Sequence, residues 1–147
     1  MVYVGLAVRV EKGKPRLRSV VLDGTDVVTF DYLAPDTDDV AEKIAAISDG
    51  LDGRLNALSG IERIVVRQGD DGARGGLTAP TVLRLRAEGA AIYLARQHCN
   101  DVRVMSGPQV GAACGGDLAG AEEQAKQIAP AAWKVSASAA LAAQLVQ

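Results

Sequence analysis

The sequence has no long apolar run: no stretch of about 18 uncharged apolar residues, the length of a transmembrane helix, occurs among its 147 residues. The first basic residues, Arg9, Lys12 and Lys14, follow the apolar stretch at the N-terminus, whereas a secretory signal places them before it. We therefore expect a cytoplasmic protein that does not contact a membrane.

Cysteine and histidine are nearly absent, since Cys99, Cys114 and His98 are the only examples. They are too few for a structural zinc site of the usual four-ligand kind, and a disulfide is not expected in the cytoplasm. We interpret His98 and Cys99 as a cation at a helix C-terminus beside a buried thiol. No cofactor is expected.

Aromatic residues are also scarce, at 3% of the chain, although 48% of the residues are hydrophobic. Much of that fraction is alanine, so we expect a closely packed core of small side chains. A chain of 147 residues fits one domain, and we expect residues 1–147 to form it. Scarce aromatics also argue against binding of single strands by base stacking.

Charge is unevenly distributed although the net charge is only −2. Residues 1–18 hold five basic residues and one acid, a net charge of +4, and residues 19–60 hold nine acids and two basic residues, a net charge of −7. The five basic residues are Arg9, Lys12, Lys14, Arg16 and Arg18. Such a basic ribbon can contact phosphates, or it can serve only solubility and protect a sheet edge.

Hydrophobic periodicity predicts three strands, then alternating helices and strands, in the order βββαβαβαα. Alternation marks the three strands between residues 2 and 35, with a tight turn at Asp23-Gly24. Helices are expected over 40–58, 77–99, 119–130 and 131–147, and strands over 61–68 and 101–106. This order predicts an α/β fold with a mixed five-stranded sheet and helices on both faces.

Two helices have predicted inward faces. In the helix over 40–58 the apolar residues recur at spacings of three and four, and they are Val40, Ile44, Ile47, Leu51, Leu55 and Leu58. In the helix over 77–99 the residues expected to face inward are Val82, Leu85, Gly89, Ile92 and Tyr93. Gly89 is expected to allow a close approach to the sheet.

Several segments, in this order, resemble the RuvC family of Holliday-junction resolvases in the RNase H-like superfamily. VGLAV is similar to the family's first strand, which ends in an acid where Ala7 stands here, and IVVRQ is similar to its fourth strand, where Arg67 replaces an acid before Gln68. LRLRAEGAAIYLARQ and PQVGAACGG resemble the helix and the segment that follow. SASAAL resembles the last helix, with Ser136 and Ala139 at the two acid positions.

The resemblance implies an RNase H-like fold and, in the family, two divalent metals that catalyse phosphodiester cleavage. Mg²⁺ requires oxygen ligands, mostly carboxylates, which Ala7, Arg67, Ser136 and Ala139 do not supply. Pro108 and Gly111 also stand where the resemblance favours basic residues. We therefore lean toward a protein that is not an enzyme, a pseudo-nuclease without metal-dependent hydrolysis.

Three hypotheses remain open. The one we favour is a degenerate RuvC-like protein that binds nucleic acid, branched or duplex DNA, or a protein partner. Its candidate nucleic-acid contacts are Arg9, Lys12, Lys14, Arg16, Arg18, Arg67 and Arg74. A structural role for Arg67 is an ion pair with an acid such as Asp70.

The second hypothesis is an active structure-specific endonuclease with relocated acids, which would use Mg²⁺ or Mn²⁺. Its candidate metal ligands are Asp23, Asp70 and Asp71, with Asp117 as a further acid. Paired aspartates in a glycine-rich loop are also common turn formers. The third hypothesis is a structural or interaction module, such as a homodimer, that binds no nucleic acid.

Overall fold

The chain begins with a three-stranded antiparallel meander in a computed structural model that describes residues 1–70 and 77–147. Its strands are β1 (Val2–Glu11), β2 (Lys14–Asp23) and β3 (Asp26–Leu33). The first turn holds Lys12 and Gly13 at positive φ, and the second, at the expected Asp23-Gly24 step, holds Gly24 there. The three predicted strands are confirmed.

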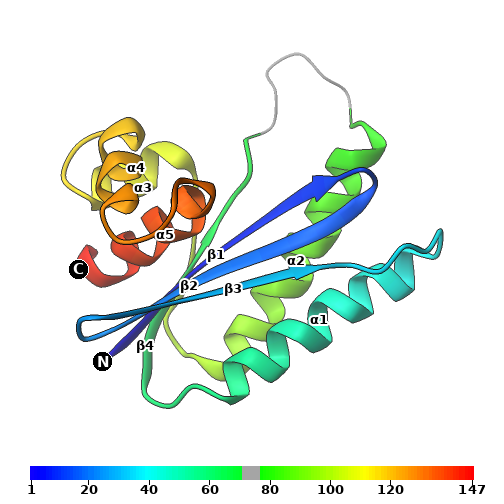
Figure 1. Cartoon of the computed structure of the whole chain (residues 1–147), viewed down its shortest axis with the longest axis horizontal. Coiled ribbons are helices and arrows are strands. Elements are labelled where there is room, and N and C mark those ends of the chain that lie inside the picture. The colour runs from blue at the N-terminus through cyan, green and yellow to red at the C-terminus, as the bar shows by residue number, and fades with distance from the viewer. Residues whose placement is uncertain (71–76) are drawn as a thin grey trace.

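Helices and strands then alternate. They are α1 (Val40–Asn56), β4 (Ile61–Arg67), α2 (Ala79–His98), β5 (Val102–Met105), α3 (Gly107–Ala113), α4 (Leu118–Lys126), the 3₁₀ turn η1 (Ala131–Trp133) and α5 (Lys134–Leu145). The sheet order is β3-β2-β1-β4-β5, with β4 and β5 parallel to β1. Helices α1 and α2 cover one face of the sheet, and α3, α4 and α5 lie on the other (Figure 1). The predicted mixed α/β fold is confirmed.

Helix α3 is an addition to the predicted order. Its N-cap is Ser106, whose side chain accepts from the Gln109 backbone N–H, while the Gln109 side chain accepts from the Ser106 N–H. Pro108 stands in the first turn, where its missing N–H costs nothing. This capping box is visible in the sequence SGPQ and is the signal that predicts a helix there.

The predicted inward face is confirmed for most of α1, although Val40 is 38% exposed, and is wrong for most of α2, where, of the large apolar residues expected inward, only Ile92 packs against the core cluster. Ile47, Leu51 and Leu55 of α1 are at most 1% exposed. On α2 the buried face is instead a stripe at a spacing of four residues, Leu83, Ala87, Ala91 and Ala95. Of the residues expected inward, Tyr93 is 66% exposed and Leu85 is 39% exposed, and Gly89 is also exposed. Small alanines, rather than the larger apolar residues, let α2 approach the sheet.

The contact between β1 and α5 is closer than a side chain allows. A Cβ added to Gly5 would lie 2.1 Å from the Ser136 carbonyl oxygen and 2.3 Å from the Ala140 nitrogen. Because both atoms belong to the backbone of α5, no side-chain rotation can relieve the contact. Gly5 therefore fixes how deeply α5 sits on the sheet.

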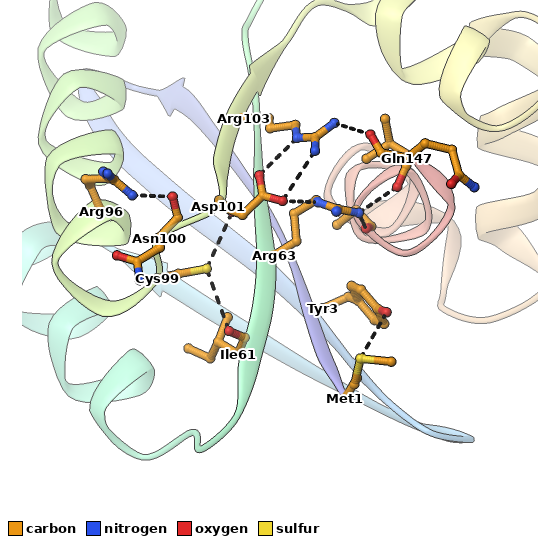
Figure 2. Close-up of polar contacts among 12 residues, drawn as sticks. Met1, Tyr3, Ile61, Arg63, Arg96, Cys99, Asn100, Asp101, Arg103 and Gln147 are labelled. Atoms are coloured by element: carbon orange, nitrogen blue, oxygen red, sulfur yellow. Dashed lines mark hydrogen bonds and ion pairs between the residues drawn. The ribbon is translucent and has the colours of Figure 1, made fainter.

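The C-terminal end of α5 is held by charged residues of the neighbouring strands (Figure 2). Arg63 donates to the carbonyl oxygens of Ala143 and Val146, and its Nε lies 2.7 Å from Asp101. Arg103 also contacts Asp101, at 3.0 Å. A cation at a helix C-terminus satisfies carbonyls that have no partner within the helix.

The C-terminal end of α2 carries the histidine and the buried thiol expected from the sequence. His98 ends α2 and its Nε2 lies 2.7 Å from Asp52 on α1, while Cys99, the C-cap, is buried. Among the residues described, no helix is long and apolar enough to cross a membrane.

Replacing two glycines by alanine should have opposite effects on stability. Gly5→Ala should lower the free energy of unfolding by about 3 kcal/mol or more, since it pushes a methyl group into the α5 backbone. Gly89→Ala should raise it by about 0.5–1 kcal/mol, because alanine favours the helix and no atom of residues 1–70 or 77–147 outside the local helix lies within 4 Å of the added methyl group. Urea unfolding of the two variants measures both, and equal effects would contradict the close β1–α5 contact.

Stability should also fall at acid pH through Asp101. The Arg103 guanidinium, and then Arg63, hold the pKa of Asp101 below its ordinary 3.8. A lowered pKa stabilises the fold above the ordinary value and ceases to do so as the pH falls through the folded-state value. The difference in unfolding free energy between wild type and Asp101→Asn should therefore be constant above about pH 5 and shrink below about pH 4. Chemical unfolding as a function of pH tests this, and a constant difference down to about pH 2 would contradict it.

Candidate nucleic-acid interface

Two arginines flank an alanine across three neighbouring strands. Ala7 of β1 is paired with Arg18 of β2 on one side and with Arg67 of β4 on the other. Paired residues point to the same face of a sheet, so the three side chains share one face, with the two arginine Cα atoms about 10 Å apart. The short side chain of Ala7 borders open space that forms two pockets, one lined also by Arg18 and the other lined also by Arg67.

Helix α5 closes one side of this space. Ser136 is 2% exposed, and its Oγ donates to the Trp133 carbonyl oxygen at 3.2 Å. A cavity of about 80 Å³ lies beside it, and its lining residues are Ala7, Val8, Arg9, Arg18, Ala132, Val135 and Ser136. Ala139, in contrast, is fully buried in the core with Val65 and Val110 and does not line this cavity.

A second, larger pocket adjoins the first. Its volume is about 290 Å³, and it is lined by Ala7, Val8, Arg9, Arg67, Gly69, Asp70, Arg84 and Val135. Ala7, Val8, Arg9 and Val135 line both pockets. We call the two pockets together the arginine cleft. Three of the four positions that the resemblance assigns to acids, Ala7, Arg67 and Ser136, line it.

Arg67 ends β4 with its side chain 6% exposed. Its Nη2 lies 3.3 Å from Asp70, so the expected ion pair is present, and its Nη1 donates to the Gln68 carbonyl oxygen. The Nε group is buried and has no hydrogen-bond partner in residues 1–70 and 77–147. Within the described residues this buried cation is thus compensated by one acid, which is itself 76% exposed.

A second ion pair lies on α2 at the same pocket. Arg84 Nη1 lies 2.6 Å from Glu88 Oε1, and both side chains are largely buried. Glu88 also accepts from the Gly69 backbone N–H at 2.9 Å, which fixes the chain where it leaves β4. Sequence reasoning missed this pair, although an arginine and a glutamate four residues apart on a helix predict one.

Most of the basic ribbon is neutralised by acids within the fold. Arg16 makes a two-pronged contact with Asp31 at 2.8 and 2.7 Å and a contact with Glu11 at 2.7 Å. These hydrogen bonds from Arg16 hold the pKa values of Asp31 and Glu11 below their ordinary range. Arg9 also pairs with Glu11, at 2.9 Å.

The remaining candidate contacts have different surroundings. Arg18 lies 3.7 Å from Asp31, donates to the Ala132 carbonyl oxygen and stacks over Trp133 at 5.4 Å. Lys14 lies 3.8 Å from Asp36, and Lys12 is exposed at the hairpin turn. Arg74 lies outside the described residues.

The candidate metal ligands that the structure describes, Asp23, Asp70 and Asp117, are not brought together. Asp23 pairs with Val2, five residues from Ala7 along β1 and so about 17 Å away. Asp70 contacts Arg67, Asp117 caps α4, and Asp71 lies outside the described residues. Among the residues that the structure describes, no three His, Cys, Asp or Glu side chains gather to hold a metal ion. The described residues that line the cleft include one carboxylate, Asp70, and it is paired with the Arg67 guanidinium, so they do not fit a pair of divalent cations.

Solved structures with a similar fold are RuvC proteins. The structure of Thermus thermophilus RuvC matches with a TM-score of 0.67 and 16% identity, over 97% of this chain and 92% of that one. T. thermophilus RuvC in complex with a Holliday junction substrate matches with a TM-score of 0.68 and 14% identity, over 97% and 91%. No protein-family model and no curated protein matches the sequence. The chain has the RuvC-like, RNase H-like fold.

Stability should depend little on Arg67 and strongly on Arg84. Arg67→Met should change the free energy of unfolding by less than about 1 kcal/mol, because an apolar side chain of similar length relieves a poorly compensated buried charge. Arg84→Met should lower it by about 3 kcal/mol, because it leaves the buried Glu88 carboxylate without its cation. Urea unfolding of both variants tests the contrast. A loss of more than about 2 kcal/mol for Arg67→Met would make Arg67 a structural residue.

Proposed function

We propose that this protein binds nucleic acid, branched DNA in the first place, through the arginine cleft and does so without metal-dependent hydrolysis. The observation that carries the proposal is the row Arg18, Ala7 and Arg67, in which two arginines border an open space on one face of the sheet. Guanidinium groups bind phosphate oxygens through paired N–H donors, and a buried one does so with little competition from water.

Electrostatics favours an anion in the cleft over a cation. Arg9, Arg67 and Arg84 line the larger pocket, and among the described residues that line it Asp70 is the one carboxylate. A divalent ion placed there would be repelled by the permanent charge of Arg67, whereas a phosphate would be attracted by it. Binding through these residues needs no cofactor.

The fold supports DNA as the source of the phosphate. One of the similar solved structures is a RuvC bound to a Holliday junction substrate, although the identity of 14% carries over only the fold. Phosphate contacts position a protein on DNA without reading its sequence, so the arginines of the cleft fit the recognition of DNA shape.

Two other functions remain as alternatives. An endonuclease with relocated acids needs Asp70 as a metal ligand, yet Asp70 faces Arg67 at 3.3 Å and lies at the opposite end of the sheet from Asp23. A protein partner or a homodimer is favoured by the edge strand β3, which pairs on its outer side with none of the residues described and exposes Val27 and Val28 by 36% and 42%.

Gel-shift titration of a labelled four-way junction, a matched duplex and a single strand tests the proposal, each with Mg²⁺ and with a chelator. We expect retardation of the junction with no cleavage under either condition. Arg67→Met should weaken junction binding by about tenfold and reduce the slope of log affinity against log salt by about one, as for a lost phosphate contact. The control is Arg96→Met, which removes the same charge about 18 Å along α2 from Arg84, a lining residue of the pocket. This variant should bind the junction as tightly as wild type.

Two results would contradict the proposal. Mg²⁺-dependent cleavage of the junction would favour the relocated acids instead. Absence of binding to all three DNAs would favour the protein-partner function, which analytical ultracentrifugation of the protein alone then tests as self-association.

A further inference from the structure

The two ion pairs at the larger pocket differ in how firmly they are made. Arg84 and Glu88 are 2.6 Å apart with side chains 12% and 6% exposed. Because Glu88 also accepts from the Gly69 N–H, its carboxylate is held from two sides. This pair is a fixed part of the pocket wall.

In the part of the chain that the structure describes, Arg67 is the only partner that holds the Asp70 carboxylate. Its 3.3 Å separation is longer than the roughly 2.7–2.9 Å of a strong charge-assisted hydrogen bond. Asp70 is 76% exposed, so water competes for its carboxylate and little is lost when it turns outward. Asp70 is therefore able to leave Arg67, whereas Glu88 is not able to leave Arg84.

Arg67 has more bonding capacity than Asp70 fills. Its guanidinium carries five N–H donors, and the buried Nε has no hydrogen-bond partner within the described part of the chain. A buried donor without a partner is costly, and a phosphate group offers several oxygens to satisfy it. The pocket beside it, of about 290 Å³, has room for such a group.

We propose that Asp70 is a built-in competitor for the phosphate group that Arg67 binds. In the free protein the Asp70 carboxylate compensates the buried cation, and an entering phosphate takes its place while Asp70 turns into solvent. This inference rests on the proposed function, since it concerns the same pocket. The ligand chemistry is a phosphate monoanion or dianion, from either a free phosphate or a DNA phosphodiester.

The competition predicts that removing the Asp70 carboxylate tightens phosphate binding. Affinity for phosphate is reduced by whatever free energy the Arg67–Asp70 contact contributes in the free protein, so its removal must tighten binding. An exposed ion pair of this kind accounts for a change of about two- to fivefold in the dissociation constant. Removing any acid also makes the protein more positive, so the test needs a second variant with the same change in charge.

The experiment compares Asp70→Asn with Asp38→Asn, an exposed aspartate in the loop before α1. Dissociation constants are measured for inorganic phosphate by isothermal titration and for a four-way DNA junction by gel shift. Asp70→Asn should bind one or both ligands about two- to fivefold more tightly than wild type, and Asp38→Asn should bind them as wild type does. Urea unfolding of both variants checks that they fold.

The possible outcomes separate this inference from the proposed function. Tightening by Asp70→Asn toward the junction supports both, and tightening toward inorganic phosphate with no junction binding by any variant keeps the competitor and overturns nucleic-acid binding. Equal tightening by both variants, or none by Asp70→Asn while wild type binds the junction, overturns the role of Asp70 and leaves nucleic-acid binding standing. No binding of either ligand by any variant overturns both.

Discussion

The absence of a side chain at Gly5 is the constraint on which the cleft depends. The backbone of α5 lies so close to β1 that a Cβ at Gly5 would meet the Ser136 oxygen at 2.1 Å. Because the helix is seated at this depth, Ser136 lies beside Ala7, and the turn η1 before the helix brings Trp133 over Arg18. A bulkier residue at position 5 would lift α5 and open the wall of the small cavity. The geometry of the cleft is therefore set by a packing contact outside it.

Packing also decides that the ion pair of Arg84 is structural whereas the ion pair of Arg67 can open. Arg67 and Arg84 each have an acid three or four residues further along the chain. Arg84 lies on α2 facing the end of β4, so its partner Glu88 is buried with it and the pair is structural. Arg67 points to the α5 side, and its partner Asp70 lies where the chain has left the sheet and remains exposed. Burial of the partner, rather than sequence spacing, decides which pair can open.

The sequence predicts the strands and α1 well because these elements have a clear hydrophobic period. It places α2 correctly but not its inward face, since the face that packs on the sheet carries Ala87, Ala91 and Ala95, whose small side chains contribute little to an apolar pattern. For the site, the resemblance indicates Ala7, Arg67 and Ser136, and the fold gathers all three at the cleft. Sequence reasoning missed the neutralising role of Asp31, although the two-residue turn after Asp23 fixes the register of β2 with β3 and so places Asp31 opposite Arg18.

Strand pairing also changes the meaning of the charge pattern. Read along the chain, residues 1–18 are basic and the following segment is acidic, which suggests a cationic ribbon. In the folded sheet β3 lies beside β2, so the acidic segment supplies Asp31 to Arg16 and Arg18, and Glu11 from within the ribbon neutralises Arg9 and Arg16. A surface whose charges are paired attracts a polyanion weakly. An anion therefore gains most at Arg67, where burial strengthens the attraction and the counterion is itself largely exposed.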